Sequence, residues 1–302
     1  MTEIRKHYFL NEYCILASGR AKRPQDFIKD DARSRRPAKD CPFCPGNETM
    51  TPPETAVYQL NSGQSWDVRC FENLYPALSP PDGHHEVIVE TAKHDASPAD
   101  FTDVEMELMV DAYQDRFNFY AHKASILYVS LFKNHKREAG ASIAHSHTQL
   151  IALPLRPSEL ERERDVIKQL DRCPYCSITK EESGSSRVIF EDQTWIAFAP
   201  FYSKTPFEVW VIPKRHINNI TCMDPSERTS FSRIFRDLLR SLKVVLDDPP
   251  YNYHFLQTIN EDYHLNIRIL PKLSIAAGFE LNTGIYILTV PPEDAAGFLR
   301  GV

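Results

Sequence analysis

The feature that most constrains this chain is an internal repeat. Two Cys-Pro-aromatic-Cys groups occur, at 41–44 and at 173–176, and each is followed by a Glu-Val-x-Val segment and then by a histidine. The segment at 86–94 (EVIVETAKH) aligns without a gap with the segment at 208–216 (EVWVIPKRH). Because a duplicated unit repeats its features in one order along the chain, we expect two similar halves.

Each half continues with the signals of a helix and a strand. Residues 97–100 (SPAD) and 224–227 (DPSE) place a capping side chain before a proline and an acidic residue, which is typical of a helix start. Apolar strands are expected at 126–132 and at 253–257. The order indicates an α+β fold in which each half has an antiparallel sheet with one long helix on a face.

Each half also supplies two cysteines and two histidines, the ligand set of a closed tetrahedral zinc site. The predicted ligands are Cys41, Cys44, His94 and His145 in the first half, and Cys173, Cys176, His216 and His264 in the second. A turn with two buried thiols, or a redox pair, is the alternative for each Cys-x-x-Cys group. Neither alternative predicts histidines at matching places in both halves.

The two halves differ two residues beyond the last expected ligand. His145 aligns with His264, but His147 aligns with Asn266 and Gln149 aligns with Arg268. The second half therefore keeps the metal ligand and lacks the second histidine. We infer that the first half, residues 1–160, carries the chemistry and that residues 161–302 form a degenerate copy.

His147 is the expected nucleophile and Gln149 its catalytic partner. A neutral imidazole with one nitrogen held by an acceptor can attack phosphorus with the other. The Gln149 amide can donate to a phosphoryl oxygen, but it cannot act as an acid or base. This combination favours transfer between phosphate groups over hydrolysis.

Several residues near the pair suit a phosphate ligand. Gly140 and Ser142 allow a close backbone approach and supply a hydroxyl, and Asn134 can donate to phosphate or ribose. Arg20 and Arg23 lie in a run of cations that can meet phosphate oxygens. Such a run is also common on a solvated surface.

Composition excludes several classes of protein. The 302 residues carry a net charge of -6, which argues against nonspecific nucleic-acid binding. No apolar run is long enough to span a bilayer, and the first residues contain no signal-peptide core, so we expect a cytoplasmic protein without a membrane partner.

Five segments resemble the galactose-1-phosphate uridylyltransferase branch of the histidine-triad superfamily: ASGRAKRP, CPFCPGNE, ENLYPAL, HHEVIVE and GASIAHSHTQ. The resemblance implies a tandem duplicated histidine-triad fold, a homodimer, and ping-pong transfer through a nucleotidyl-histidine at His147. It also implies that Phe43, Asn73, Val87 and Asn134 line a nucleoside pocket and that Arg20, Arg23, Gly140 and Ser142 contact phosphates. The second half resembles the plant-type ADP-glucose phosphorylases, through its Cys-x-x-Cys group with two histidines and through the segments at 249–253 and 277–287.

The leading interpretation is a nucleotidyltransferase that moves a nucleoside monophosphate from an NDP-hexose to a sugar 1-phosphate, as a UDP-glucose:hexose-1-phosphate uridylyltransferase does. The first alternative is an ADP-glucose phosphorylase, which transfers an adenylyl group to phosphate. The others are a dinucleoside polyphosphate hydrolase, which Gln149 disfavours, and a noncatalytic zinc scaffold. Base preference and acceptor stay open.

Overall fold

The central element is one ten-stranded sheet that runs through both halves of the chain. The computed structural model describes residues 2–17, 37–60, 63 and 65–301. The strand order is β3-β4-β5-β7-β6-β11-β12-β10-β9-β8, and every pair of neighbours is antiparallel. The strands are β3 (Glu54–Tyr58), β4 (Val68–Glu72), β5 (His84–Val89), β6 (Tyr128–His135), β7 (His147–Leu153), β8 (Val188–Glu191), β9 (Trp195–Phe198), β10 (Val209–Pro213), β11 (Tyr251–Leu256) and β12 (Asn266–Pro271).

The two halves meet edge to edge in the middle of this sheet. β6 of the first half pairs with β11 of the second, with Asn134 opposite Asn252 and Phe132 opposite His254. Each half thus contributes an antiparallel sheet and one long helix, as predicted, but the two sheets are continuous. The expected boundary at residues 160 and 161 falls inside helix α2 (Ser158–Ile167).

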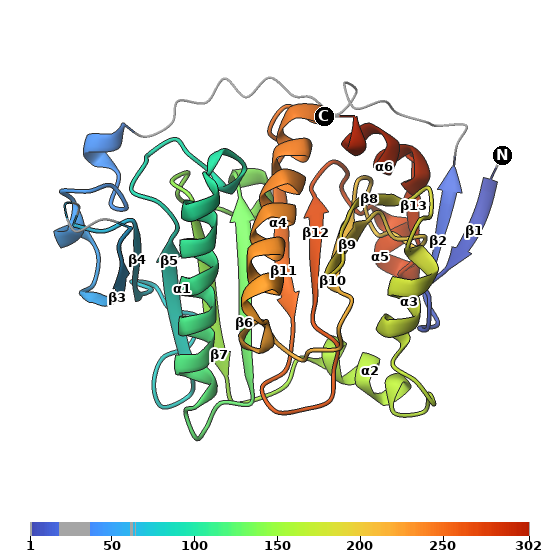
Figure 1. The fold of residues 1–302 in the computed structure, drawn as a ribbon, viewed down its shortest axis with the longest axis horizontal. Coiled ribbons are helices and arrows are strands. Elements are labelled where there is room, and N and C mark those ends of the chain that lie inside the picture. Colours follow the sequence, from blue (N-terminus) through green and yellow to red (C-terminus); the bar gives the residue numbers. More distant parts are fainter. Residues whose placement is uncertain (1, 18–36, 61–62, 64, 302) are drawn as a thin grey trace.

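The long helices α1 (Asp103–Ala121) and α4 (Pro225–Val245) lie side by side over one face of the sheet (Figure 1). Their apolar sides share one large core with the sheet residues beneath them, among them Leu131, Leu150 and Ile267. On the opposite face, α2 and α3 (Pro174–Glu182) cover the second half. The site described below lies on that opposite face of the first half.

Helix α4 begins where the sequence predicts, and α1 begins later. Asp224 caps α4 by accepting from Glu227 N at 2.9 Å. Ser97, by contrast, starts only a short 3-10 turn, Pro98–Asp100. The chain then runs extended through Phe101, which is buried, and Thr102 becomes the N-cap of α1. Burial of Phe101 in the core therefore separates the first capping signal from the helix.

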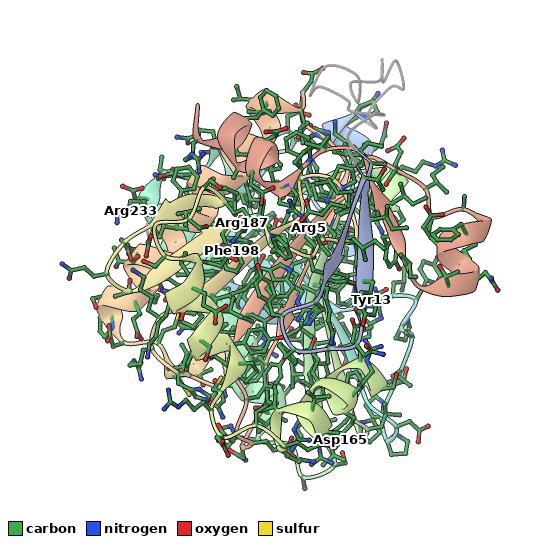
Figure 2. All side chains as sticks on the ribbon, turned by 90° about the vertical axis from the view of Figure 1, so that its right-hand side faces the viewer. Arg5, Tyr13, Asp165, Arg187, Phe198 and Arg233 are labelled. Carbon is green, nitrogen blue, oxygen red and sulfur yellow. The ribbon has the colours of Figure 1, made fainter. Side chains whose placement is uncertain are left out.

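A small second sheet joins the two ends of the chain. It has the order β1-β2-β13, formed by β1 (Thr2–Lys6), β2 (Tyr13–Ala17) and β13 (Tyr286–Leu288). Arg5 on β1 and Arg187 before β8 both bind the carboxylate of Glu293, at 3.1 and 3.0 Å, and the two arginines are neighbours in Figure 2. Glu293 belongs to α6 (Pro292–Arg300), which follows α5 (Gly278–Thr283) and β13. Within the described parts of the chain, no helix is long and apolar enough to cross a membrane.

Candidate active site

The predicted ligands of the first half converge on one point. Cys41 and Cys44 lie before β3, His94 follows β5, and His145 precedes β7. His145 Nδ1 lies 3.6 and 3.5 Å from the two sulfurs, and His94 Nδ1 lies 3.0 Å from Cys44 Sγ. His145 Nε2 lies 2.8 Å from the carbonyl of Thr91, to which it can donate, so that Nδ1 faces the sulfurs.

The second half repeats this arrangement. His264 Nδ1 lies 3.6 Å from Cys173 Sγ and 3.4 Å from Cys176 Sγ, and His264 Nε2 lies 2.8 Å from Pro213 O. His216 Nδ1 lies 3.5 Å from Cys176 Sγ. In each half the four ligand atoms all lie within 4.8 Å of one another.

Both groups fit a tetrahedral zinc ion by their donors and by their closeness. Each offers two thiols and two imidazole nitrogens, and each buried histidine directs its other nitrogen to a backbone carbonyl. Burial raises the pKa of Cys44 and of Cys173 to about 12, so each thiol would release its proton on binding the metal.

His147 is the first residue of β7 and is buried beside the first metal group. Its Nδ1 lies 2.8 Å from the carbonyl oxygen of His145, which can accept only if Nδ1 carries the proton. Burial, and then the charge of Lys133, lower the pKa of His147 to about 4, so the ring is neutral near pH 7. The lone pair of this neutral ring is therefore on Nε2.

A buried ion pair supports His147 from the helix side of the sheet. Lys133 Nζ donates to Glu90 at 2.5 Å and to the backbone oxygen of His147 at 2.9 Å. Glu90 also accepts from Ser146 Oγ at 2.6 Å and from Thr148 Oγ1 at 2.5 Å. Burial raises the pKa of Glu90, but Lys133 and these hydroxyl groups outweigh burial and lower it to about 2, so Glu90 is ionised.

Sequence reasoning missed this pair, although the repeat contains a signal for it. In the gap-free alignment, Glu90 aligns with Ile212. The first half therefore has an acidic residue at a strand end where the second half has an apolar one. A fully buried acid requires a partner of opposite charge. Nothing in the local sequence marks Lys133 as that partner.

Gln149 lies on the same face of the sheet as His147. In the pairing of β5 with β7, Gln149 lies opposite Val87 and His147 lies opposite Val89. Gln149 Oε1 is 2.9 Å from Nε2 of His85, a buried histidine that the sequence did not single out.

The predicted nucleoside residues also gather on this face. The ring of Phe43 contacts His147 edge to face, with centroids 5.2 Å apart, and packs in one cluster with Val87. Asn73 Nδ2 lies 3.2 Å from His85 Nε2. Asn134 Oδ1 accepts from Asn252 Nδ2 at 2.8 Å, so its own amide hydrogens stay available for a ligand.

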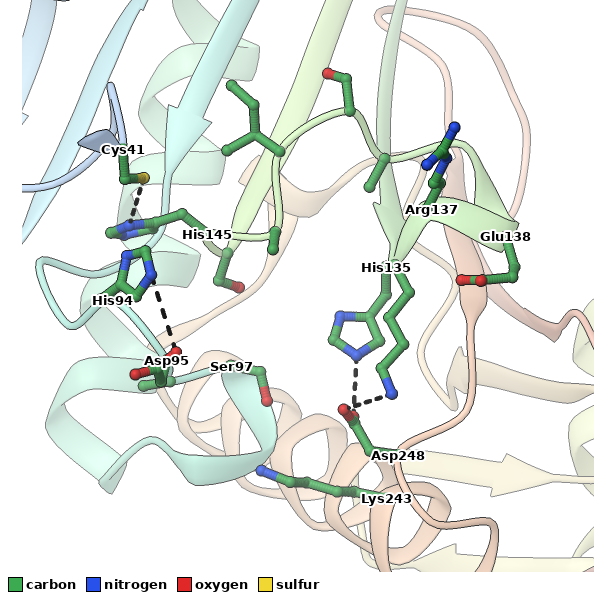
Figure 3. Close-up of a pocket in the computed structure, with 17 residues that line it drawn as sticks. Cys41, His94, Asp95, Ser97, His135, Arg137, Glu138, His145, Lys243 and Asp248 are labelled. Carbon is green, nitrogen blue, oxygen red and sulfur yellow. Dashed lines mark hydrogen bonds and ion pairs between the residues drawn. The ribbon is translucent and has the colours of Figure 1, made fainter. Parts of the chain in front are cut away.

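The segment at 140–142, which precedes the metal ligand His145, lies close to Asn134. Gly140 has φ +96, and a side chain added there would lie 3.5 Å from Asn134 Nδ2. Ser142, Cys41 and His145 are among the residues that line a cavity of about 490 Å³. Figure 3 is a close-up of this cavity. Arg20 and Arg23 lie outside the described residues.

The corresponding place in the second half is filled by the chain itself. Asn266 Nδ2 donates to the carbonyl of His264 at 3.1 Å, as His147 does to His145. Arg268, the counterpart of Gln149, donates to Glu163 of α2 at 2.8 Å. Glu163 and Arg268 are both buried, so the residue that replaces Gln149 is paired with a carboxylate of the chain itself.

Comparison with known proteins places this geometry in a family. A family model described as a domain of unknown function (DUF4921) matches residues 85–298. The chain is 34% identical to ADP-glucose phosphorylase of Arabidopsis thaliana, over 99% of this chain and 93% of that protein. It is 27% identical to galactose-1-phosphate uridylyltransferase of Thermotoga maritima, over 99% and 98% of the two chains. A crystal structure of the Arabidopsis thaliana phosphorylase with bound ADP-glucose superposes with a TM-score of 0.84 at 33% identity, covering 100% of this chain and 99% of that one.

Proposed function

Because this chain belongs to the family that contains galactose-1-phosphate uridylyltransferases and ADP-glucose phosphorylase, we propose that it transfers a nucleoside monophosphate from an NDP-hexose through a covalent adduct on His147. The protein is a nucleotidyltransferase of this family. The observation that carries the proposal is the fixed proton of His147. With Nδ1 held by the His145 carbonyl, the lone pair of Nε2 is free to attack.

The two steps need no general acid or base. Nε2 of His147 attacks the α-phosphorus, an N–P bond forms, and the bond to the β-phosphate oxygen breaks to release hexose 1-phosphate. An oxygen of the acceptor phosphate then attacks the same phosphorus, and the N–P bond breaks. The proton stays on Nδ1 of His147, hydrogen-bonded to the carbonyl oxygen of His145, throughout, and the Gln149 amide donates to a nonbridging oxygen in both transition states.

Zinc has a structural part in this proposal. A zinc ion bound by Cys41, Cys44, His94 and His145 would hold the end of β7, so that the carbonyl of His145 and the ring of His147 keep their geometry. With all four positions of the site taken by the protein, the metal would contact no substrate.

Two substrate pairs fit the reaction. The first is uridylyl transfer from UDP-glucose to a sugar 1-phosphate, the reaction of the uridylyltransferases that align with nearly the whole chain. The second is adenylyl transfer from ADP-glucose to inorganic phosphate. It is favoured by the 34% identity to ADP-glucose phosphorylase and by the second Cys₂His₂ group.

The test is a panel of labelled nucleotide sugars with detection of the protein adduct. UDP-glucose and ADP-glucose, each labelled in the α-phosphate, are incubated with the protein, and galactose 1-phosphate or inorganic phosphate is then added. We expect one nucleotide sugar to label His147, and one acceptor to remove the label. Absence of label with both donors, in protein that contains zinc, would contradict the mechanism.

We also propose that the protein is a homodimer. Large apolar side chains are exposed at two places, Leu74 and Tyr75 after β4, and Ile275 and Leu281 near α5, with exposed fractions of 57%, 85%, 91% and 77%. Exposed apolar clusters of this kind are typical of protein interfaces. Light scattering should give twice the chain mass of 34.8 kDa.

A further inference from the structure

We propose that His85 is a positioning residue that holds the amide of Gln149 in the one orientation that supports phosphoryl transfer. The role rests on the proposed function, because it has meaning only if Gln149 donates to a phosphoryl oxygen. The observation behind it is the contact between His85 Nε2 and Gln149 Oε1 at 2.9 Å.

The backbone decides which nitrogen of His85 carries the proton. The backbone N–H of Ala77 donates to His85 Nδ1 at 3.0 Å, so Nδ1 must present a lone pair. Burial lowers the pKa of His85, so the ring is neutral near pH 7 and its single proton is on Nε2. Nε2 is therefore a hydrogen-bond donor toward Gln149.

A donor at this position fixes the orientation of the Gln149 amide. Only the amide oxygen can accept from His85 Nε2, so the NH₂ group must point away from His85. Among the described residues, no group accepts a hydrogen bond from this NH₂ group. A phosphoryl oxygen requires a donor, and a Gln149 turned by 180° would present its oxygen instead and repel the developing charge.

Asn73 does not compete for this proton. Its Oδ1 accepts from the backbone N–H of Tyr75 at 2.9 Å, which fixes the Asn73 amide with Nδ2 toward His85. In the tautomer set by Ala77, both His85 Nε2 and Asn73 Nδ2 are donors. Gln149 is therefore the acceptor for His85, and the Asn73 amide is left to donate to a ligand.

The pairing of His85 with Gln149 occurs only in the half that has a nucleophile. The residue of the second half that aligns with Gln149 is Arg268, when His145 is aligned with His264. Arg268 is bound by Glu163 of α2 at 2.8 Å. The amide that His85 contacts is thus replaced where His147 is also missing.

The experiment is a double-mutant cycle on the rate of adduct formation. The variants are His85→Phe, Gln149→Met and the double variant, assayed in single turnover with labelled UDP-glucose and ADP-glucose. His84→Phe is the matched control, because His84 is the adjacent residue of β5, on the opposite face of the sheet and beside Tyr120. Zinc content and the unfolding midpoint are measured for every variant.

We expect His85→Phe to lower the maximal rate of labelling about 10- to 100-fold, and by no more than Gln149→Met lowers it. The concentration of nucleotide sugar at half-maximal rate should change little, because orientation of the amide matters most in the transition state. In the Gln149→Met background, His85→Phe should have no further effect. His85→Gln, which restores a donor, should recover part of the rate even if His85→Phe folds poorly.

Two outcomes would overturn the assignment. If His85→Phe labels at the wild-type rate while Gln149→Met is slow, His85 has no positioning role, although the proposed function stands. If His85→Phe lowers the rate equally with and without Gln149, it acts by a general structural effect. No label on the wild-type protein with either nucleotide sugar would reject the proposed function and this role together.

Discussion

At the scale of single residues, the reactive histidine depends on polar groups that are almost entirely buried. His147 receives support on one side from the carbonyl of His145 and on the other from Lys133, which binds its backbone oxygen. Lys133 and Glu90 are 1% and 2% exposed. A buried pair of this kind contributes little net stability, but the loss of one partner leaves an uncompensated charge.

Replacement of Lys133 tests this dependence. We expect Lys133→Met to lower the free energy of unfolding by about 3–5 kcal/mol, because Glu90 would remain buried and charged without its partner. Urea unfolding monitored by fluorescence measures the change. The double variant Lys133→Met/Glu90→Gln removes both charges and should recover much of the loss. Equal loss in the single and double variants would contradict this explanation.

A second residue-scale prediction concerns acid stability. His7 Nδ1 accepts from the backbone N–H of Leu10 at 3.1 Å, and burial, followed by the charge of Arg268, lowers the pKa of His7 to about 3. Between pH 6.5 and pH 3 the unfolded chain binds a proton at His7 that the folded chain excludes, so stability falls as pH falls. The slope from this residue is at most about 1.4 kcal/mol per pH unit.

The measurement is the pH dependence of the free energy of unfolding for the wild type and for His7→Asn. Asparagine can accept from the same backbone N–H without titrating, so the variant should have a shallower acid slope. Identical slopes in the two proteins would show that His7 titrates normally in the folded state.

At the scale of elements, the two long helices share a packing role but begin differently. Asp224 caps α4 directly before Pro225, whereas α1 begins at Asp103 after a 3-10 turn and an extended link. The hydroxyl oxygen of Thr102 accepts from the backbone N–H of Glu105, and the carboxylate of Glu105 accepts from the backbone N–H of Thr102. These two hydrogen bonds form a capping box.

Thr102→Ala should therefore lower stability by about 1 kcal/mol, because it leaves the first N–H groups of α1 without their acceptor. Thr102→Ser keeps the hydroxyl group and should stay within a few tenths of a kcal/mol of the wild type. Chemical denaturation of the two variants provides the comparison. If Thr102→Ser lost more stability than Thr102→Ala, the methyl group of Thr102, rather than its capping hydroxyl group, would carry the contribution to stability.

At the scale of the whole molecule, one sheet contains a site with a nucleophile and a copy that lacks one. Both halves gather two cysteines and two histidines, and in the first half His147 and Gln149 follow the metal ligand on one face of the sheet. In the second half, α2 and α3 cover that face, and Glu163 binds Arg268 there. The second metal group is thus expected to be purely structural.

Matched ligand variants separate the two metal groups. We expect the wild type to contain about two zinc ions per chain, one for each Cys₂His₂ group. His94→Asn and His216→Asn should each lower the zinc content by one ion, as measured by elemental analysis. Only His94→Asn should abolish adduct formation, whereas His216→Asn should lower the unfolding temperature and still form the adduct. Loss of the adduct in both variants would show that the two halves depend on each other.

The sequence alone determined the elements whose information is local or repeated. The two ligand groups, the two long helices and the distinction between His145 and His147 follow from spacing and from the alignment of the halves, because a duplicated unit keeps its order along the chain. The start of α4 was likewise predictable, since an N-cap acts through residues only three positions away.

The tertiary structure decided what depends on contacts between distant strands. The pairing of β6 with β11 merges two sheets into one, and no sequence pattern encodes which edges meet. His85, Lys133 and Glu163 gain their roles from partners on other elements, at separations where spacing carries no signal. Burial is the physical reason in each case, because it fixes which proton a histidine keeps and which charge a carboxylate must meet.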